Sequence, residues 1–466
     1  MRLREVSLTN FRCFDQLRIE FPPDLTVLVG NNGSGKTAIL DAIGYALSRI
    51  LARLPDIEGK NLRREDIRIE RQGVQAPFVR VEVRSTDDIQ WTRTLKRDPT
   101  RQTAAEVPDA IGDKGLFEFL DPTIHAIEEG QQATLPVFAY YGVSRAVFEI
   151  PERRRDFRKE FRRFDALENA LQPTTRFKDL FEWFYAQQHD EMDQLTQAVF
   201  TPEFDFTPEF QAWLESVHRQ GRQSATPGTP RLAGPLPVLQ AVRDAISQVI
   251  PGFTHPRIKT NPLRMVLTQR LADNSKRELS LQMLSDGYRT MLALVMDFAR
   301  RMAQANSHLD KPLEAEAILM VDEIDLHLHP VWQQTVIPSF RRAFPNTQLI
   351  LSTHSPQVLT TVEAEKILIV ETSGIRPCPA PTYGARSSDV VAEVLGLKSL
   401  RPPDNEIAEK ISSLFRALDA GRLDEAKGLR AELESWAKGF PEPDLVRADL
   451  LIRRLEHQEH HPTPAA

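Results

Sequence analysis

The chain has 466 residues, of which 41% are hydrophobic and 27% charged, an ordinary balance for a globular protein of about three domains. Its 59 basic and 65 acidic side chains give a formal net charge of −6, so nucleic-acid binding would require a local basic patch. The sequence has no apolar run of membrane-spanning length, no apolar signal core after Met1, and too few cysteines (Cys13 and Cys378) for a disulfide framework or a cysteine-built zinc site, so we expect a cytoplasmic protein that contacts no membrane.

The N-terminal part of the chain is predicted to be rich in strands. Residues 17–21 alternate apolar and polar side chains, and residues 25–29 form an apolar run typical of a buried central strand. A helical pattern follows over 39–50, a β-hairpin is predicted over 77–97, and a short buried strand over 135–141.

The middle of the chain combines helices with two further strands. Residues 151–220 have a helical pattern, 221–237 are rich in proline and glycine and predict a loop, and 238–250 return to a helix. Residues 317–321 and 348–352 are predicted as parallel central strands, because helical patterns lie between them.

The C-terminal part is predicted to be helical. From Asp404 onward the pattern gives three short helices, broken at Gly421 and around Pro441–Pro443. Residues 457–466 are polar, and we expect them to be disordered, with their histidines in a solvated tail rather than a metal site.

Residues 30–37 fit the pattern G-x-x-x-x-G-K-[ST] and lie between a predicted strand and a predicted helix. In this motif the glycines let backbone N–H groups converge on phosphate oxygens, the lysine adds a positive charge and the last hydroxyl can ligate Mg²⁺. The positive end of the following helix points to the same place. We therefore expect ATP and Mg²⁺ at Gly30, Asn31, Asn32, Gly33, Ser34, Gly35, Lys36 and Thr37.

The predicted strand at 317–321 ends in two carboxylates, Asp322 and Glu323. Acidic residues often occupy solvated strand ends, so the pair alone is weak evidence. Together with the phosphate loop it predicts that Asp322 holds Mg²⁺, directly or through water, and that Glu323 polarises an attacking water.

Further motifs, taken in their order and spacing, resemble those of ABC-type ATPases. Leu284–Arg289 resembles the signature motif, Asp322 and Glu323 the Walker B segment with its catalytic glutamate, Asp325 the D-loop, and Thr353–Pro356 the histidine switch. The segment from residue 10 to 14 resembles the opening strand of the RecF, SMC, Rad50 and OLD-nuclease group, and the likeness covers about residues 1–370.

This resemblance implies roles for several side chains. In ABC-type ATPases the signature motif faces the nucleotide of the other subunit, so Ser285 and the Gly287 backbone would bind the γ-phosphate in trans, and two ATP molecules would join a head-to-head dimer. His354 would orient the γ-phosphate, and Arg12 would lie near the nucleotide. Arg145 lies where a Q-loop would fall, although no Q-loop glutamine is readable.

Three stretches, 135–142, 321–330 and 383–403, resemble the PtuA-like ATPases of Septu and related retron anti-phage systems. That resemblance implies an ATPase that partners a separate HNH nuclease. An OLD-type nuclease domain is not expected in this chain, because Thr372 replaces the motif glycine after Glu371 and no D-x-D follows. The two distant cysteines exclude a Rad50-like hook, and the interval before the signature motif is too short for SMC-like arms.

Several features keep two interpretations open. His327, His329 and His354 suggest a metal site, but they are more simply part of the D-loop and switch segments. A basic stretch with interleaved phenylalanines predicts either a helix whose arginines contact nucleic acid, or a solvated helix or Arg-Glu pairing surface between subunits. The C-terminal helices could dock a partner or another subunit, or pack on the ATPase domain of their own chain. The basic residues are Arg153, Arg154, Arg155, Arg158, Lys159, Arg162 and Arg163.

The sequence therefore predicts an α/β fold, a P-loop NTPase of ABC-ATPase type with a helical insertion and a helical C-terminal module. We expect the two halves of the head at 1–150 and 251–375, the insertion at 151–250 and the module at 376–466. The first functional hypothesis is a dimeric regulatory ATPase of an anti-phage complex that controls an HNH nuclease. The second is a RecF-like DNA-repair or recombination accessory ATPase; a transporter ATPase is disfavoured, because its signature motif would lie closer to the phosphate loop.

Overall fold

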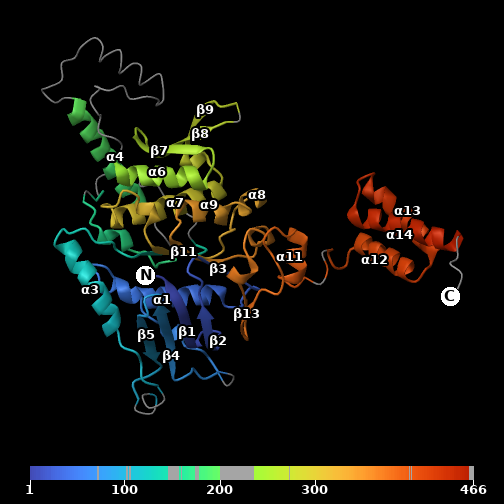
Figure 1. Cartoon of the computed structure of the whole chain (residues 1–466), viewed down its shortest axis with the longest axis horizontal. Coiled ribbons are helices and arrows are strands. Elements are labelled where there is room, and N and C mark those ends of the chain that lie inside the picture. Colours follow the sequence, from blue (N-terminus) through green and yellow to red (C-terminus); the bar gives the residue numbers. More distant parts are fainter. Residues whose placement is uncertain are drawn as a thin grey trace, which may run out of the picture. The chain divides into compact units, whose positions relative to one another are not determined.

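The computed structural model describes the chain in two compact units, residues 1–390 and 391–466 (Figure 1). The described residues are 1–70, 73–100, 103, 107–144, 157–158, 160–173, 178–199, 236–271, 273–397, 399 and 401–460. None of the helices in these ranges combines the length and apolarity needed to cross a bilayer.

The first unit contains a central six-stranded sheet. Its strands lie in the order β13-β12-β3-β11-β10-β6, and every neighbouring pair is parallel except β12 and β13. All residues of β3, β6, β10 and β11 are buried, which explains their nearly continuous apolar sequences. The strands are β3 (Leu25–Val29), β6 (Val137–Tyr141), β10 (Ala317–Val321), β11 (Thr347–Ser352), β12 (Ile367–Glu371) and β13 (Gly374–Pro377). The parallel strands predicted from the sequence are confirmed.

A four-stranded antiparallel sheet covers the other side of helix α1 (Lys36–Leu51), in the order β2-β1-β4-β5. The Trp91 indole N–H of this sheet donates to the Ala46 carbonyl of α1 at 3.0 Å, so the helix is fixed between the two sheets. The predicted hairpin at 77–97 is confirmed as β4 and β5. The strands are β1 (Leu3–Phe11), β2 (Phe14–Glu20), β4 (Phe78–Ser85) and β5 (Gln90–Lys96).

Helix α7 (Asp286–Ala305) is anchored by a buried ionic network. Asp297 accepts from the Tyr141 hydroxyl at 2.7 Å and pairs with Arg300 and Arg301. Burial alone would raise the pKa of Asp297, but the two guanidinium groups outweigh it and hold that pKa below its usual range. Arg301 also donates to the Ala166 carbonyl at 2.7 Å. The network thus fixes α7 against β6 and the 3₁₀ turn at 164–167.

The remaining helices of the first unit surround these sheets. They are α3 (Lys114–Glu128), α4 (Lys178–Val199), α6 (Pro237–Val249), α8 (Pro330–Gln333), α9 (Val336–Ala343), α10 (Pro356–Leu359) and α11 (Ser387–Glu393). The described residues of this unit also form the short 3₁₀ helices η1 (Arg64–Asp66), η2 (Phe164–Leu167), η3 (Leu281–Met283), η4 (Pro312–Glu314) and η5 (Ala364–Lys366).

A third sheet precedes the signature segment and was not predicted from the sequence. It is antiparallel and consists of β7 (Phe253–Thr260), β8 (Leu263–Arg270) and β9 (Lys276–Ser280), in that order. The Gln188 side chain of α4 donates to and accepts from the backbone of Ile258, which satisfies the outer edge of β7.

The helix predicted for the basic stretch at 153–163 is absent from the part of that stretch that the structure describes. Residues 157–158 and 160–163 form no helix, and the regular structure that follows is the 3₁₀ turn η2. Residues 145–156 and 159, like the predicted loop up to residue 235, lie outside the described residues.

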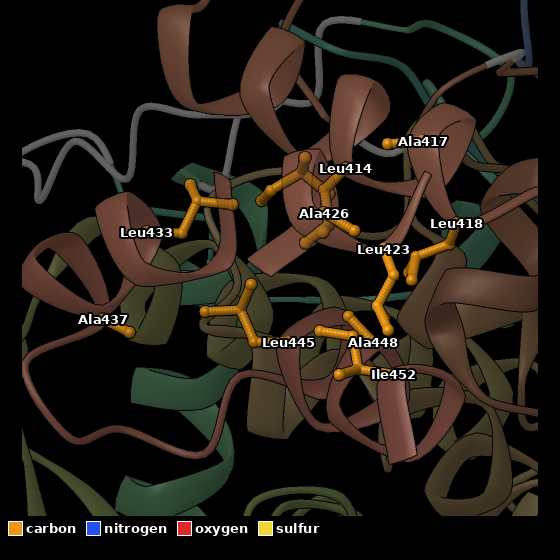
Figure 2. Packing of buried hydrophobic residues seen from close by; sticks show 11 residues of the cluster. Leu414, Ala417, Leu418, Leu423, Ala426, Leu433, Ala437, Leu445, Ala448 and Ile452 are labelled. Atoms are coloured by element: carbon orange, nitrogen blue, oxygen red, sulfur yellow. The ribbon is translucent and has the colours of Figure 1, made fainter. Parts of the chain in front are cut away.

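The second unit is a bundle of three helices, as predicted: α12 (Glu406–Asp419), α13 (Leu423–Ala437) and α14 (Pro443–His460). The Asn405 side chain caps α12 by accepting from the backbone N–H groups of Ile407 and Ala408. Figure 2 shows the apolar side chains of the three helices meeting in one cluster, with Leu414, Leu433 and Leu445 pointing inward. The amphipathic faces therefore pack on one another within this unit.

We predict that Leu414→Ala lowers the stability of the bundle by about 3 kcal/mol, because Leu414 is 0% exposed and the change leaves a cavity. Hydrogen exchange of the α12–α14 amides in the full chain measures the effect. Leu450→Ala is the matched control, since Leu450 is 62% exposed, and it should change stability by under about 0.5 kcal/mol. Equal losses of protection in the two variants would contradict this core.

Candidate nucleotide-binding site

The phosphate loop lies between the end of β3 and the start of α1. A Cβ at Gly30 would lie 2.2 Å from the Val370 carbonyl oxygen, and Gly35 has φ 106°, so both positions require glycine. The Lys36 ammonium donates to the carbonyls of Gly30 (2.9 Å) and Asn31 (3.1 Å). Within the described part of the chain the buried Ser34 hydroxyl has no hydrogen-bond partner. The loop thus offers a cation, an unsatisfied hydroxyl and a helix N-terminus at one point.

The acidic strand end meets this loop directly. The Thr37 hydroxyl donates to Asp322 Oδ2 at 2.7 Å, which joins two positions 285 residues apart. The other oxygen of Asp322 accepts from Ser352, and the Ser352 hydroxyl accepts from the Glu323 N–H at 2.8 Å. The carboxyl ends of β10 and β11 therefore fix the carboxylate beside the loop.

The Lys36 ammonium is partly buried. Burial lowers the pKa of Lys36, and the carboxylates of Asp322, Glu323 and Asp325 act against that shift. Asp322 is 1% exposed, and its Oδ2 faces Thr37 of the loop. A hydroxyl and a buried carboxylate are hard oxygen donors, which fit Mg²⁺. Thr37 and Asp322 would hold that ion.

The D-loop and the switch segment are connected to each other. Asp325 accepts from the Thr353 hydroxyl, and Thr353 in turn accepts from the Ser355 N–H at 3.0 Å. His354 lies between these two residues and is half-buried. Glu323 has φ 49°, a left-handed backbone that is unusual for a non-glycine residue and occurs here at the turn after β10.

The signature residues line a different hollow, of about 510 Å³. Ser285 is the residue before α7, and a Cβ on Gly287 would lie 2.3 Å from the His327 carbonyl oxygen. The Tyr288 and Trp332 rings meet edge to face at 4.2 Å between centroids. The lining residues are Ser285, Gly287, Tyr288, His327, Leu328, His329, Val331 and Trp332, all of them outside residues 30–37. The hollow is therefore lined by the signature residues and by the segment that follows Asp325, and by no residue of the phosphate loop.

Arg12 is positioned beside α1 by two carboxylates. Its guanidinium lies 2.7 Å from Asp41 and 2.9 Å from Asp66. Burial lowers the pKa of Arg12, but the two carboxylates outweigh that effect and raise it. Lys60 lies 3.6 Å from Asp41, and burial lowers the pKa of Lys60.

Sequence reasoning missed Asp41, Asp66, Lys60 and Ser352. A signal existed for Asp41, a charged residue in the first turns of a helix that is otherwise apolar, and for Ser352, a hydroxyl at the end of a buried strand. Lys60 lies in an irregular segment and Asp66 ends the short 3₁₀ helix η1, and neither position has such a pattern.

The histidines and the basic stretch singled out from the sequence form other contacts. His327 and His329 line the signature hollow, and within the described ranges no group of three His, Cys, Asp or Glu side chains could hold a metal ion. Three arginines of the basic stretch contact this chain instead. Arg158 pairs with Asp165 and Glu168, Arg162 pairs with Asp56 and Asp165, and Arg163 donates to the backbone carbonyls of Ala305 and Ala133. The remaining basic residues of the stretch, and Arg145, lie outside the described residues.

Comparison with known proteins gives consistent matches. A family model described as "AAA domain" matches residues 5–199, and one described as "AAA domain, putative AbiEii toxin, Type IV TA system" matches residues 146–360. The chain is 28% identical over 452 residues to the Retron Ec83 probable ATPase of Escherichia coli, covering 87% of this chain and 78% of that protein. It is 29% identical over 424 residues to the Retron Vc95 probable ATPase of Vibrio cholerae serotype O1 biovar El Tor, covering 84% and 78%.

A shorter match and a solved structure complete the comparison. Septu protein PtuA of Bacillus mycoides (strain KBAB4) is 28% identical over 166 residues, covering 34% of this chain and 23% of that protein. The SMC head domain from Thermotoga maritima is 16% identical with a TM-score of 0.41, covering 82% of this chain and all of the other. The phosphate loop, the strand-end carboxylates and the central parallel sheet agree with these matches, and the chain has the features of an ABC-type P-loop ATPase of the RecF/SMC/Rad50 group.

Proposed function

We propose that the chain binds ATP with Mg²⁺ at the phosphate loop and hydrolyses it. The hydrogen bond between Thr37 and Asp322 carries this proposal, because it brings the loop and the strand-end carboxylate to one place. Lys36 would neutralise the phosphates, and Glu323 would accept a proton from the attacking water. The metal ion would supply charge neutralisation at the phosphate oxygens.

Hydrolysis would occur across a dimer of two copies. The signature hollow and the phosphate loop share no lining residue in one chain, so Ser285 and the Gly287 backbone of one copy would complete the site of the other. His354 would orient the γ-phosphate from its place beside the D-loop contact of Thr353. Arg12 would contribute a fixed positive charge near the nucleotide.

The biological role that we propose is regulation of a separate HNH-type nuclease in a bacterial anti-phage defence complex. The similarity to two retron ATPases over more than four fifths of the chain supports it, together with the shorter likeness to Septu PtuA. A RecF-like accessory role in DNA repair is the second candidate, and a match of 51% identity over 45 residues to RecF of Paenarthrobacter aurescens (strain TC1) favours it.

Affinity purification from the native host, followed by mass spectrometry, tests this role. We expect an HNH nuclease to co-purify and the chain to elute as a dimer only with Mg²⁺ and ATP. Recovery of the chain without any nuclease, together with ATPase activity stimulated by DNA, would contradict nuclease control and favour the RecF-like role.

A further inference from the structure

Helix α8 contacts three motifs of the candidate nucleotide-binding site. It is four residues long, follows the D-loop segment in the chain, and is labelled in Figure 1. The His329 side chain caps it by accepting from the Val331 N–H at 3.4 Å, and Pro330 occupies its first position, where the missing N–H of proline costs nothing. Two adjacent side chains of this short helix, Trp332 and Gln333, contact different motifs.

The Gln333 amide joins the D-loop segment to the switch segment. Its N–H group donates to the Leu328 carbonyl at 2.9 Å and lies 3.5 Å from the Asp325 carbonyl, and its oxygen accepts from the Ser355 hydroxyl at 2.7 Å. Ser355 directly follows His354 in the chain. One side chain therefore connects the backbone of the D-loop segment to the segment that carries the switch histidine.

The Trp332 ring contacts the signature segment. It meets the Tyr288 ring edge to face with 4.2 Å between centroids, and Tyr288 meets the Phe253 ring of β7 at 5.1 Å. Aromatic pairs of this kind stabilise a structure beyond the apolar area that they bury. Tyr288 directly follows Gly287, where an added Cβ would lie 2.3 Å from the His327 carbonyl oxygen. The signature segment thus packs on α8 through a ring and on the D-loop segment through its backbone.

The D-loop segment has a backbone that needs support from its surroundings. Glu323 and His327 have φ of 49° and 63°, in the left-handed region that non-glycine residues rarely adopt. A backbone of this kind costs about 1–3 kcal/mol per residue and persists only where neighbouring groups hold it. The Gln333 amide supplies such support, because Leu328, whose carbonyl it binds, directly follows His327. Loss of this hydrogen bond would release the segment on which Gly287 packs.

We infer that Gln333 is a positioning residue that aligns both halves of the composite ATPase site. Through the switch segment it acts on the nucleotide bound by its own chain, and through the D-loop segment it acts on the signature residues that serve the partner copy. This inference rests on the proposed hydrolysis across a dimer. Among the described residues Gln333 forms no hydrogen bond with residues 30–37, so ATP binding to the monomer should not depend on it.

The test variant is Gln333→Met in the full chain, which keeps the length of the side chain and removes its hydrogen bonds. We expect kcat for ATP hydrolysis to fall by about 100-fold, because small displacements of catalytic groups have effects of that size. The dissociation constant of a fluorescent ATP analogue for the monomer should stay within about twofold of the wild-type value. Gln334→Met is the matched control: it makes the same change at the next residue, which is exposed, and should have wild-type activity.

Mixing with two other inactive variants separates the two roles of Gln333. Lys36→Ala disables the phosphate loop of its own copy, and Gly287→Ala disables the signature segment that its copy provides to the partner. If Gln333 acts on both halves, every composite site in either mixed dimer has a defect, and neither mixture regains activity. A Gln333→Met copy that is defective only in its signature segment would be rescued by Lys36→Ala. A copy that is defective only in its switch segment would be rescued by Gly287→Ala.

Rescue in either mixture, to about a quarter of wild-type activity, would overturn the inference. Wild-type turnover by Gln333→Met would also overturn it, as would loss of ATP binding by the monomer, since Gln333 would then support the fold rather than align the site. A mixture of Lys36→Ala with Gly287→Ala distinguishes these results from a failure of the proposed function. If that mixture recovers activity, the composite site stands whatever the result for Gln333; if it does not, the composite site and this inference are both overturned.

Discussion

Glu323→Gln should lower the ATP hydrolysis rate by about 10³-fold and leave the protein as an ATP-bound dimer. The amide cannot accept a proton from water, whereas Lys36, Thr37 and Asp322 remain in place to bind nucleotide. The Glu323 N–H to Ser352 bond involves only the backbone of residue 323, so the turn after β10 should keep its shape. Steady-state ATPase assays and size-exclusion chromatography with light scattering measure the two effects.

Glu371→Gln provides the matched control. Glu371 also lies at the end of a strand of the same sheet, but its carboxylate pairs with Arg376 and forms no hydrogen bond or ion pair with the phosphate loop among the described residues. It should hydrolyse ATP at the wild-type rate and dissociate after turnover. A Glu323→Gln protein that hydrolyses ATP as fast as the control would show that Glu323 is not the general base.

The sequence predicted the parts of this site that depend on local pattern. The apolar runs at 25–29 and 317–321 required burial on both faces, and the glycines of the loop could be recognised because their spacing has a mechanical reason. The motifs predicted Thr37 and Asp322 as ligands of one Mg²⁺ ion, and the two side chains do form a hydrogen bond. Motif spacing therefore predicted geometry across 285 residues.

The features that the sequence could not show depend on pairing between distant segments. The cations at 257–277 are ordinary in a linear reading, and only the register of three strands places five of them on one face. The basic residues of 153–163 looked more suggestive, yet Arg158 pairs with Asp165 and Glu168, and Arg162 pairs with Asp56 and Asp165. Charge density along a chain is thus a poor guide to charge on a surface.

Gly287→Ala should abolish ATP hydrolysis while leaving ATP binding to the monomer intact. The added Cβ would lie 2.3 Å from the His327 carbonyl oxygen, so the start of α7 or the D-loop must move. The phosphate loop lies in another part of the chain and is not disturbed. Gly115→Ala in α3 is the control, since a Cβ there meets nothing within 4 Å, and it should have wild-type activity.

Mixing two inactive variants tests the trans arrangement directly. In a dimer of one Gly287→Ala copy and one Lys36→Ala copy, one composite site carries both defects and the other carries none. An equal mixture that re-equilibrates should therefore regain about a quarter of wild-type activity, because half of the dimers are mixed and each has one intact site of two. Two variants with all catalytic groups in a single chain could not rescue each other. A mixture that stays inactive while its subunits exchange would place the signature motif in cis and contradict the composite site.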